Sequence, residues 1–463
     1  MFFMKQGYEK MNIIIVGCGK IGSTILESLV EEGHDVVGID TDEKVINEMT
    51  NMYDVMGVCG SGTDCEMLTE AGVENAEIFI AATSSDELNM ISCFIARKMG
   101  AKHTIARIRN PEYNQKNLGF LKQQLDLSMA INPEMLAAVE MFNILKLPSA
   151  VKIQTFSQRN FEIIEMILKE GSALAGMKLM DLRNKFKAKF LVCVVQRGEE
   201  VYIPSGNFQL MAGDKIGLTA SPSEIQKLMR SLGVDKKKAK DIMILGGSKI
   251  AYYLARMLTA SGNGVKIVEQ DHAKCEELSE SLDKAVIIEG DGAQQELLLE
   301  EGLKTLDAFV ALTGIDEENI LISIFASTQK VPTVISKINR NELASMAARL
   351  GLDCIISPKK IVSDVIVRYA RALENSRGSN VETLYNIMDD KAEVLEFNVR
   401  SDFKQVNIPL RDLTLKKNIL IAGIIRDRKP IIPSGDDFIM KNDKVIVVVG
   451  SEQRLNDLSD IVK

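Results

Sequence analysis

Short apolar runs alternate with longer helical patterns through much of the chain. In the first part, the runs that we expect to form strands lie at 12–16, 35–39, 54–58, 77–81 and 104–108. Between them, the spacing of apolar residues predicts helices, for example over 20–32 and 85–99. Strands that alternate with helices are typical of a parallel, doubly wound sheet, so we expect an α/β fold of the Rossmann type here.

A second pattern follows, in which short strands are joined by turns. The expected strands of this part lie at 161–168, 191–196, 201–203 and 215–220, with a brief helix at 179–182. Similar strands recur at 392–399, 419–426, 430–432 and 445–449. This pattern predicts a small α+β domain after each Rossmann-like part. Amphipathic helices are expected in between, at 133–145 and 358–374, and their apolar stripes are compatible with core packing or with pairing to another subunit.

The chain contains an internal repeat. Gly17, Lys20 and Asp40 correspond to Gly246, Lys249 and Glu269, each 229 positions later. The correspondence continues at an offset of 230, where Asp86 and Asn89 meet Asp316 and Asn319, and it returns to 229 at the two Pro-Ser-Gly turns, 204–206 and 433–435. A match sustained along the whole length indicates a tandem duplication.

The duplication divides the chain into four expected domains. The two Rossmann-like domains are expected at 11–131 and 240–357, and the two small domains at 150–232 and 380–463. Connecting helices are expected at 132–149 and 358–379. A linker is expected at 233–239, where a run of lysines is typical of a solvated segment.

Composition excludes several classes of function. The formal net charge of −8 argues against general nucleic-acid binding, which needs a large basic surface. No apolar run reaches the ~20 residues that cross a bilayer, and the first ten residues lack the apolar core of a signal peptide, so we expect a cytoplasmic protein. The seven cysteines are scattered and form no metal-ligand spacing, which predicts reduced thiols and no metal site.

Gly17-Cys18-Gly19-Lys20-Ile21-Gly22 is a G-x-G-x-x-G motif between an expected strand and an expected helix. In this context the first glycine permits a tight turn, the second lets the backbone approach a pyrophosphate, and the third lets helix and strand pack closely. The amide groups at the helix start would then face the phosphates. The motif therefore predicts nucleotide binding.

Asp40 closes the second expected strand, 18 residues after Gly22. A carboxylate at this place accepts hydrogen bonds from both ribose hydroxyls and disfavours a 2′-phosphate. NAD(H) or an adenine nucleotide is therefore expected rather than NADP(H). The alternative is that Asp40 only caps the turn that follows it.

The second copy of the motif has diverged. Gly246-Gly247-Ser248-Lys249-Ile250-Ala251 keeps the first glycine but has serine and alanine in place of the other two, and Glu269 is one methylene longer than Asp40. Weak nucleotide binding, binding of a different nucleotide and a purely structural role all stay open for this copy.

Other candidate residues follow later strands at the same edge of the sheet. Arg107 ends the fifth strand, where its guanidinium could contact a phosphate; an inter-subunit salt bridge is the alternative. Lys337, its counterpart, offers a point charge. Thr83 and Ser84, together with the turn at 60–61, are expected to border the nucleotide.

Catalytic groups are not apparent. The only histidines are His34, His103 and His272, and we find no constellation around them that could donate or accept a proton in hydride transfer. A phosphate-binding loop of the G-x-x-x-x-G-K-[ST] type is missing as well. Binding without chemistry is therefore expected, and the protein is predicted not to be an enzyme.

With these motifs the sequence resembles the TrkA family, the peripheral regulatory subunits of bacterial and archaeal Trk potassium uptake, which are built from RCK (or KTN) domains. The resemblance extends from Met11 to the C-terminus. It rests on GCGKIG at 17–22, GID at 38–40, AATSSDELNM at 81–90, IARIRNPEY at 105–113 and the repeated PSG and DK signatures.

The resemblance implies NAD(H) or ATP/ADP contacts in both copies. In the first copy they would lie at Gly17, Cys18, Gly19, Lys20, Ile21, Asp40, Thr83, Ser84 and Arg107. In the second copy they would lie at Gly246, Gly247, Ser248, Lys249, Ile250, Glu269, Thr313 and Lys337. It further implies a homo-oligomer, a dimer or a tetrameric ring, at the inner face of the membrane under a potassium transporter subunit of the TrkH or KtrB type.

Two other functions stay open at this point. One is a free-standing sensor whose small domains bind a second messenger such as a cyclic dinucleotide. The other is a soluble NAD-dependent oxidoreductase, which would require a catalytic acid that we do not find in the sequence.

Overall fold

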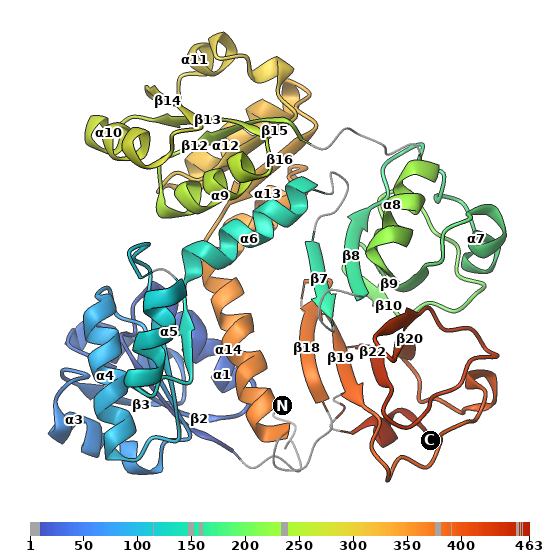
Figure 1. Cartoon of the computed structure of the whole chain (residues 1–463), viewed down its shortest axis with the longest axis horizontal. Coiled ribbons are helices and arrows are strands. Elements are labelled where there is room, and N and C mark those ends of the chain that lie inside the picture. Colours follow the sequence, from blue (N-terminus) through green and yellow to red (C-terminus); the bar gives the residue numbers. More distant parts are fainter. Residues whose placement is uncertain are drawn as a thin grey trace. The chain divides into compact units, whose positions relative to one another are not determined.

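The computed structural model describes residues 10–113, 115–146, 152–156, 161–232, 239–375, 381–389, 391–450, 453, 455 and 457–463. Among these residues, the strands form two parallel sheets of six strands and two antiparallel sheets of five (Figure 1). The predicted combination of Rossmann-like sheets and small α+β parts is thereby confirmed. The predicted linker at 233–239 lies outside the described residues except for Ala239.

The first parallel sheet has the order β3-β2-β1-β4-β5-β6. Its strands are β1 (Asn12–Val16), β2 (Asp35–Asp40), β3 (Met56–Cys59), β4 (Ile78–Ala81), β5 (His103–Arg107) and β6 (Met129–Ile131). Its helices are α1 (Lys20–Glu31), α2 (Glu43–Met52), α3 (Cys65–Glu70), η1 (Val73–Asn75), α4 (Asp86–Met99) and α5 (Gln115–Gln124). All the strands predicted for this part are confirmed, with small shifts at their ends.

The order of these strands decides where a ligand could bind. β1 pairs with β2 on one side and with β4 on the other, all in parallel. The connections therefore run to opposite sides of β1, first toward β2 and β3 and later toward β4. The turns that follow the carboxyl ends of β1 and β4 diverge as a result. In open α/β sheets this switch point is where ligands collect. The turns after β1, β2, β4 and β5 all meet at this edge.

The second parallel sheet repeats the first, with the order β14-β13-β12-β15-β16-β17. Its strands are β12 (Asp241–Leu245), β13 (Gly264–Glu269), β14 (Ala285–Glu289), β15 (Ala308–Ala311), β16 (Thr333–Lys337) and β17 (Cys354–Ile356). Its helices are α9 (Lys249–Ala260), α10 (His272–Ser281), α11 (Gln295–Glu300), η3 (Leu303–Thr305), α12 (Asp316–Thr328) and α13 (Asn341–Arg349). The identical strand order agrees with the tandem duplication inferred from the sequence.

Each parallel sheet is followed by an antiparallel one. The first has the order β10-β9-β11-β8-β7 and the second β18-β19-β22-β20-β21. The elements of the first are β7 (Lys152–Phe156), β8 (Phe161–Ile167), α7 (Leu179–Lys185), β9 (Leu191–Arg197), β10 (Glu200–Tyr202), β11 (Lys215–Ala220) and α8 (Pro222–Ser231). Those of the second are β18 (Val381–Ile387), β19 (Ala392–Asn398), η4 (Leu410–Asp412), β20 (Ile419–Arg426), β21 (Lys429–Ile431), β22 (Lys444–Gly450) and η5 (Leu458–Ile461).

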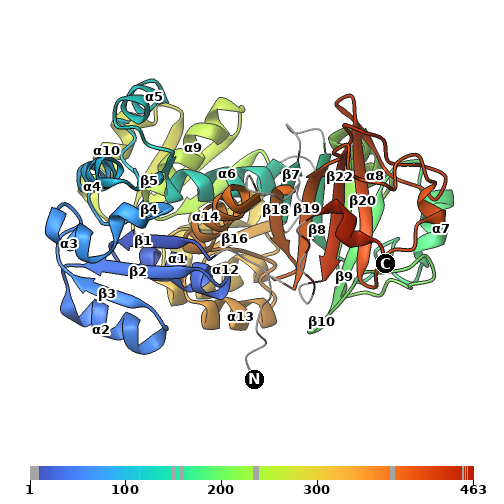
Figure 2. The same cartoon turned by 90° about the horizontal axis from the view of Figure 1, so that it is seen from below.

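The two antiparallel sheets share a buried apolar cluster. From the first it contains Phe161, Ile163, Cys193 and Val194, and from the second it includes Ile387, Met388, Ala422, Ile425, Ile446 and Val448. Thr219 Oγ1 also donates to Ala422 O at 3.0 Å. Figure 2 draws β8, β9, β20 and β22 of the two sheets in one group. The small parts of the two copies thus pack on each other.

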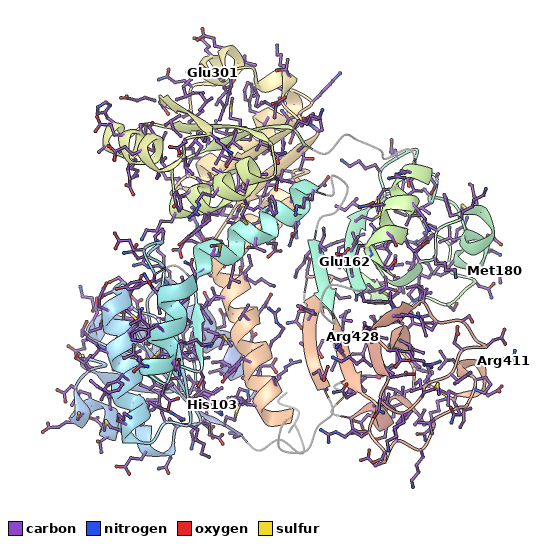
Figure 3. The ribbon with its side chains drawn as sticks, in the orientation of Figure 1. His103, Glu162, Met180, Glu301, Arg411 and Arg428 are labelled. Atoms are coloured by element: carbon purple, nitrogen blue, oxygen red, sulfur yellow. The ribbon has the colours of Figure 1, made fainter. Side chains whose placement is uncertain are left out.

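The helices α6 (Pro133–Lys146) and α14 (Pro358–Asn375) occupy the predicted connecting positions. Two compact units divide the chain, and Ser357–Ala370, which holds most of α14, belongs with the first parallel sheet although it follows the second in sequence. Ser363 Oγ donates to Thr24 O at 3.4 Å. Tyr369 forms a hydrogen bond of 3.0 Å with His103, which is labelled in Figure 3.

The apolar stripe of α14 is buried, as Val362, Ile366 and Ala370 expose 2% or less of their surface. Of the two readings that the sequence left open for this stripe, core packing therefore holds. None of the described helices combines the length and the apolar character that a membrane-crossing segment needs.

Candidate functional site

The first glycine turn has the geometry that the motif predicts. Gly17 follows β1 with φ of +86°, a left-handed conformation that favours glycine. Its amide donates to Ile39 O at 2.8 Å, which ties the turn to β2. A Cβ at Gly17 would stand 2.8 Å from Thr83 N. The backbone after β1 and the backbone after β4 therefore approach each other closely, and only glycine permits this contact.

The other two glycines act differently. A Cβ at Gly22 would stand 1.9 Å from Gly17 O, so close packing of α1 on the turn requires a glycine there. At Gly19, by contrast, no described atom outside Gly19 and its two chain neighbours lies within 4 Å of the place that a Cβ would occupy. Gly19 is the N-cap of α1 and has no side chain to cap the helix. The backbone amides in the first turn of α1 lack intrahelical acceptors, and the space beside the start of the helix is open.

Asp40 links the turn to the end of β2. Its Oδ2 accepts from Cys18 N at 2.7 Å, and its Oδ1 accepts from Asp42 N at 3.0 Å. The capping contact considered from the sequence is thus present, together with a second contact to the glycine turn. The side chain is half-buried, and an ionised carboxylate has about four acceptor positions, of which these bonds use two. Asp40 keeps capacity to accept from a sugar.

The side chain of Cys18 points away from such a ligand. It is 3% exposed, and its Sγ lies near Ile15 O and Ile39 O, both at 3.8 Å. Burial, with a smaller contribution from the charge of Asp40, raises the pKa of the thiol to about 12. Cys18 can therefore contact a ligand through its backbone but not through its side chain. Lys20, which begins α1, is exposed.

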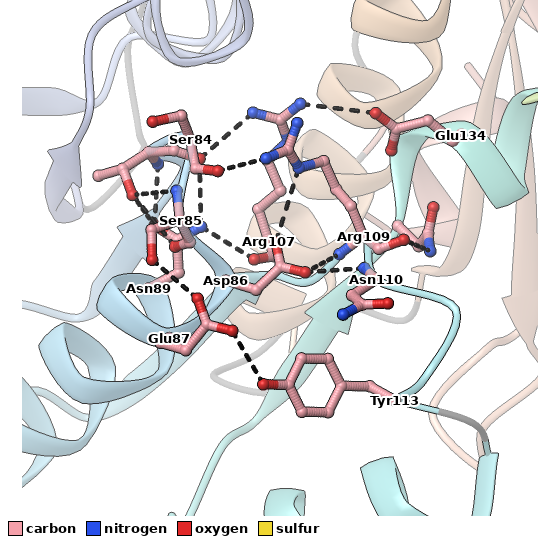
Figure 4. Close-up of polar contacts among 12 residues, drawn as sticks. Ser84, Ser85, Asp86, Glu87, Asn89, Arg107, Arg109, Asn110, Tyr113 and Glu134 are labelled. Carbon is pink, nitrogen blue, oxygen red and sulfur yellow. Dashed lines mark hydrogen bonds and ion pairs between the residues drawn. The ribbon is translucent and has the colours of Figure 1, made fainter. Parts of the chain in front are cut away.

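A polar network joins the ends of β4 and β5 (Figure 4). Thr83 donates to Asn89 Oδ1 from its amide at 2.9 Å and from its hydroxyl at 2.7 Å. Asn89 Nδ2 in turn donates to Arg107 O at 2.9 Å. Asn89 is fully buried in α4. In the sequence Asn89 stands out only as a repeated position, and in the structure its side chain fixes the two predicted site residues Thr83 and Arg107.

Asp86 and Arg109 extend this network. Asp86 Oδ2 accepts from Arg109 N at 2.8 Å and from Asn110 N at 2.7 Å, which holds the turn after β5. The guanidinium of Arg109 donates to Ser84 O. The repeat of Asp86 as Asp316 was the signal that could have identified it, since Asp316 accepts in the same way from Asn339 N and Arg340 N.

Arg107 has an intrachain acidic neighbour that the sequence did not predict. Its Nη1 donates to Thr83 O at 3.3 Å, and its Nη2 lies 3.7 Å from Glu134 Oε1, at the start of α6. In the part of the chain that the structure describes, Arg107 Nε and Glu134 Oε2 are buried without a hydrogen-bond partner. Burial lowers the pKa of Arg107, and the charge of Glu134 opposes this shift. The guanidinium is thus desolvated and incompletely satisfied.

The second copy has the same frame with different contacts. Gly246 has φ of +94°, and Thr313 N donates to Asn319 Oδ1 at 2.9 Å, as in the first copy. Glu269 Oε2 accepts from Gly247 N at 2.6 Å. Its Oε1 accepts from Gln270 N and Asp271 N, both at 2.9 Å, and the residue is 8% exposed. Ser248 is the N-cap of α9, and its hydroxyl accepts from Ala251 N at 3.4 Å.

The remaining candidates lie in matching places. Lys249 begins α9 and is exposed, and Lys337 ends β16, where its backbone carbonyl accepts from Asn319 Nδ2 at 3.0 Å. His272, at the start of α10, pairs with Glu289 at 2.8 Å, and this hydrogen bond raises the pKa of the imidazole. Within the described residues, no group of His, Cys, Asp and Glu side chains could hold a metal ion.

Family models match the chain in tandem. The model described as the TrkA-N domain matches residues 13–133 and 242–358, and the model described as the TrkA-C domain matches residues 163–233 and 394–463. These ranges cover the two parallel sheets and most strands of the antiparallel ones. Each copy of the repeat thus contains both models in the same order.

Relatives match over nearly the full length. The Trk system potassium uptake protein TrkA homolog of Archaeoglobus fulgidus is 30% identical over 437 residues, which cover 94% of this chain and 97% of the relative. The Trk system potassium uptake protein TrkA of Halomonas elongata is 28% identical over 453 residues, with 97% and 98% covered.

Solved structures share the fold. The crystal structure of the GsuK RCK domain matches with a TM-score of 0.63 and 17% identity, over 96% of this chain and 93% of that one. The GsuK channel bound to NAD matches with a TM-score of 0.63 and 16% identity, over 96% of this chain and 77% of that one. With two family models in tandem and relatives of matching length, the chain belongs to the TrkA family.

Proposed function

We propose that the chain is a nucleotide-binding regulatory subunit that gates a membrane potassium-uptake transporter. The Archaeoglobus and Halomonas relatives are named as Trk system potassium uptake proteins, which supports this role. In this proposal the protein is cytoplasmic, assembles into a homo-oligomer and docks at the inner face of the membrane on an integral transporter subunit. It performs no catalysis itself.

The ligand in this proposal is NAD(H), ATP or ADP. Structures of GsuK, which has the same fold, carry NAD in one case and ADP in another. In the first copy, the turn at 17–22 and the start of α1 would hold the phosphates, and Asp40 would accept from the ribose. The observation that carries this proposal is the uncapped start of α1 at Gly19, which faces open space next to the carboxylate of Asp40.

Arg107 is the proposed link from the nucleotide to the rest of the protein. A buried guanidinium with an unpaired Nε favours an anionic partner. A phosphate can form two short, parallel hydrogen bonds with it, which are stronger than the contact with the carboxylate of Glu134 at 3.7 Å. A nucleotide that draws Arg107 away from Glu134 releases the first turn of α6. The effect on gating depends on the difference in affinity between the two states, typically ~1–3 kcal/mol.

Nucleotides that differ in phosphate charge therefore differ in effect. ATP and ADP compete with Glu134 through more negative charge than NAD carries at the same place. A nucleotide that binds at the second copy, however weakly, would contact the turn at 246–250, Glu269, Thr313 and Lys337. The expected outcome is a subunit that responds to the nucleotide state of the cell.

Nucleotide binding by the purified chain tests the first half of the proposal. Asp40→Asn should weaken NADH and ADP binding by roughly 1.5–3 kcal/mol, because it removes a charge-assisted hydrogen bond to the sugar. Asp35→Asn is the matched control, since Asp35 begins β2 at the opposite end of the same strand and is an exposed carboxylate that pairs with Lys10 at 3.0 Å. Calorimetry should show weaker binding in the first variant alone, while thermal unfolding shows that both variants fold. Equal affinity in all three proteins would contradict the assignment.

Capture from membranes tests the second half. A tagged chain should co-purify with an integral potassium transporter, and the yield should change when NADH is exchanged for ATP. A free-standing sensor would bind nucleotide without this partner. An oxidoreductase would instead turn over a hydroxy or carbonyl substrate with NAD(H).

A further inference from the structure

The two copies of the site differ in how completely their own residues satisfy them. In the first copy, Gly19 precedes α1, offers no cap and leaves open space beside the helix start. In the second copy, Ser248 holds the same position before α9, and its hydroxyl accepts from Ala251 N. An amide that already has an acceptor gains less from a phosphate than a free one does, and the serine side chain also occupies space.

The acidic residues at the sugar position differ in the same sense. Asp40 is half-buried and accepts from two backbone amides. Glu269 is 8% exposed and accepts from three, those of Gly247, Gln270 and Asp271. The carboxylate of the second copy therefore has less remaining capacity to accept from ribose hydroxyls. This observation is independent of the helix cap and points the same way.

Charge at the sheet edge adds a third difference. Glu289 ends β14 and Asp291 follows it, at the positions that Cys59 and Ser61 hold in the first copy. Two additional carboxylates at the end of the neighbouring strand repel an anionic nucleotide. His272 partly offsets this charge by pairing with Glu289, but it is exposed and screened by solvent.

We propose that the residue at the helix cap decides which copy takes an adenine nucleotide: Gly19 keeps the first copy open, and Ser248 keeps the second copy closed by capping it. The inference rests on the proposed nucleotide-binding function and deepens it. The wild-type chain should bind one NADH or ADP per subunit tightly. Any binding at the second copy should be at least tenfold weaker.

Exchange of the two cap residues tests the inference. Calorimetry with NADH and with ADP measures the number of tight sites per chain. Ser248→Gly should raise the affinity of the second copy at least fivefold and reveal a second site. Gly19→Ser should weaken the first site at least tenfold. The double variant with both exchanges should move the tight site from one copy to the other.

Two measurements separate the effect of the helix cap on binding from a general loss of folding. Gly19 has φ of −67°, which any residue adopts, and the added side chain meets open space. Gly19→Ser should therefore raise the melting temperature of the free protein while it weakens binding, since serine caps helices well. Gly19→Ala is the control that adds the Cβ without the hydroxyl, and it should weaken binding less than serine does.

The outcomes distinguish the two proposals. Two tight sites of equal affinity in the wild-type chain, or a folded Ser248→Gly variant without a gain in binding, would overturn the cap inference and leave nucleotide binding intact. A wild-type chain that binds no adenine nucleotide would overturn both.

Discussion

At the scale of single residues, Arg107 and Glu134 form the contact on which the proposed response depends. Their side chains expose 15% and 18% of their surface, and the closest atoms of the pair are 3.7 Å apart. The distance exceeds that of a charge-assisted hydrogen bond, about 2.7–2.9 Å. Desolvation of both groups is thus only partly offset by their attraction, and a better anion can displace Glu134.

Replacement of Glu134 by glutamine should favour phosphate-rich nucleotides. The change removes the competing charge and keeps the shape of the side chain. We expect ATP affinity to rise about three- to tenfold, equivalent to roughly 1 kcal/mol, and NADH affinity to rise less. Titration of the purified variant with each nucleotide measures this difference.

Glu74→Gln is the control for the loss of one negative charge. Glu74 is exposed in η1, which precedes β4 and so lies at the amino edge of the sheet, away from the site. It should leave both affinities unchanged. A fall in ATP affinity upon Glu134→Gln would mean that Glu134 supports the nucleotide and does not compete with it.

At the scale of elements, the small sheets repeat one ion pair that locks a turn. In the first, the Arg197 guanidinium contacts Asp214 through Nε at 2.7 Å and Nη2 at 2.8 Å. Asp214 is 1% exposed and also accepts from Met211 N. The second sheet has the same arrangement with Arg426, Asp443 and Met440 N. The repeated Asp-Lys signature of the sequence therefore has a structural cause.

Asp214→Asn and Asp443→Asn should each destabilise the small part that contains them. Asparagine cannot supply the charge, so the arginine loses its bidentate partner while the site stays buried. We expect a loss of about 2–3 kcal/mol, which denaturant titration of each variant measures. Asp436→Asn removes a carboxylate that is 78% exposed and pairs with Arg411, and it should cost less than about 0.5 kcal/mol.

The elements differ in how well the sequence predicts them. Strands such as β1 and β4 are buried on both sides and read as unbroken apolar runs, so their positions followed from the sequence alone. β7 and β18 were missed because they pair on one side only and carry polar residues between the apolar ones. α8 was also missed, although Ser221 as cap, Pro222 after it and Glu224 in the first turn are a helix-start signal.

The site shows the same division. The glycine turn, Asp40 and Arg107 follow from local motifs, and the structure brings them to one edge of the first sheet. Asn89, Arg109 and Glu134 contact these residues from distant positions in the sequence, and no local pattern marks such contacts. The difference between Gly19 and Ser248 was visible in the sequence. The sequence does not show, however, that the helix start at Gly19 is open and that the one at Ser248 is capped by the serine hydroxyl.

At the scale of the whole molecule, the two copies of the repeat contact each other through their small antiparallel sheets. Their shared cluster is built from residues of both copies that expose 5% or less of their surface. Polar contacts flank it, since Lys215 bridges Glu165 of its own sheet and Asp389 of the other, each at 3.0 Å. The small parts of the two copies are thereby joined by packed side chains and by an ion-pair bridge.

Gly423 in β20 tests whether this interface exists in solution. A Cβ there would stand 2.3 Å from the ring of Phe161, a fully buried residue of the other sheet, so one of the two must shift. Gly423→Ala should cost about 1–3 kcal/mol, and Phe161→Leu on the same chain should restore part of the loss because it makes room for the methyl group. Gly206→Ala is the control, since its Cβ meets Met180 at an ordinary 3.6 Å. Thermal unfolding of the wild type, Gly423→Ala, the double variant and Gly206→Ala measures these differences in stability. A Gly423→Ala variant as stable as the Gly206→Ala control would mean that the two small sheets do not pack on each other in this way.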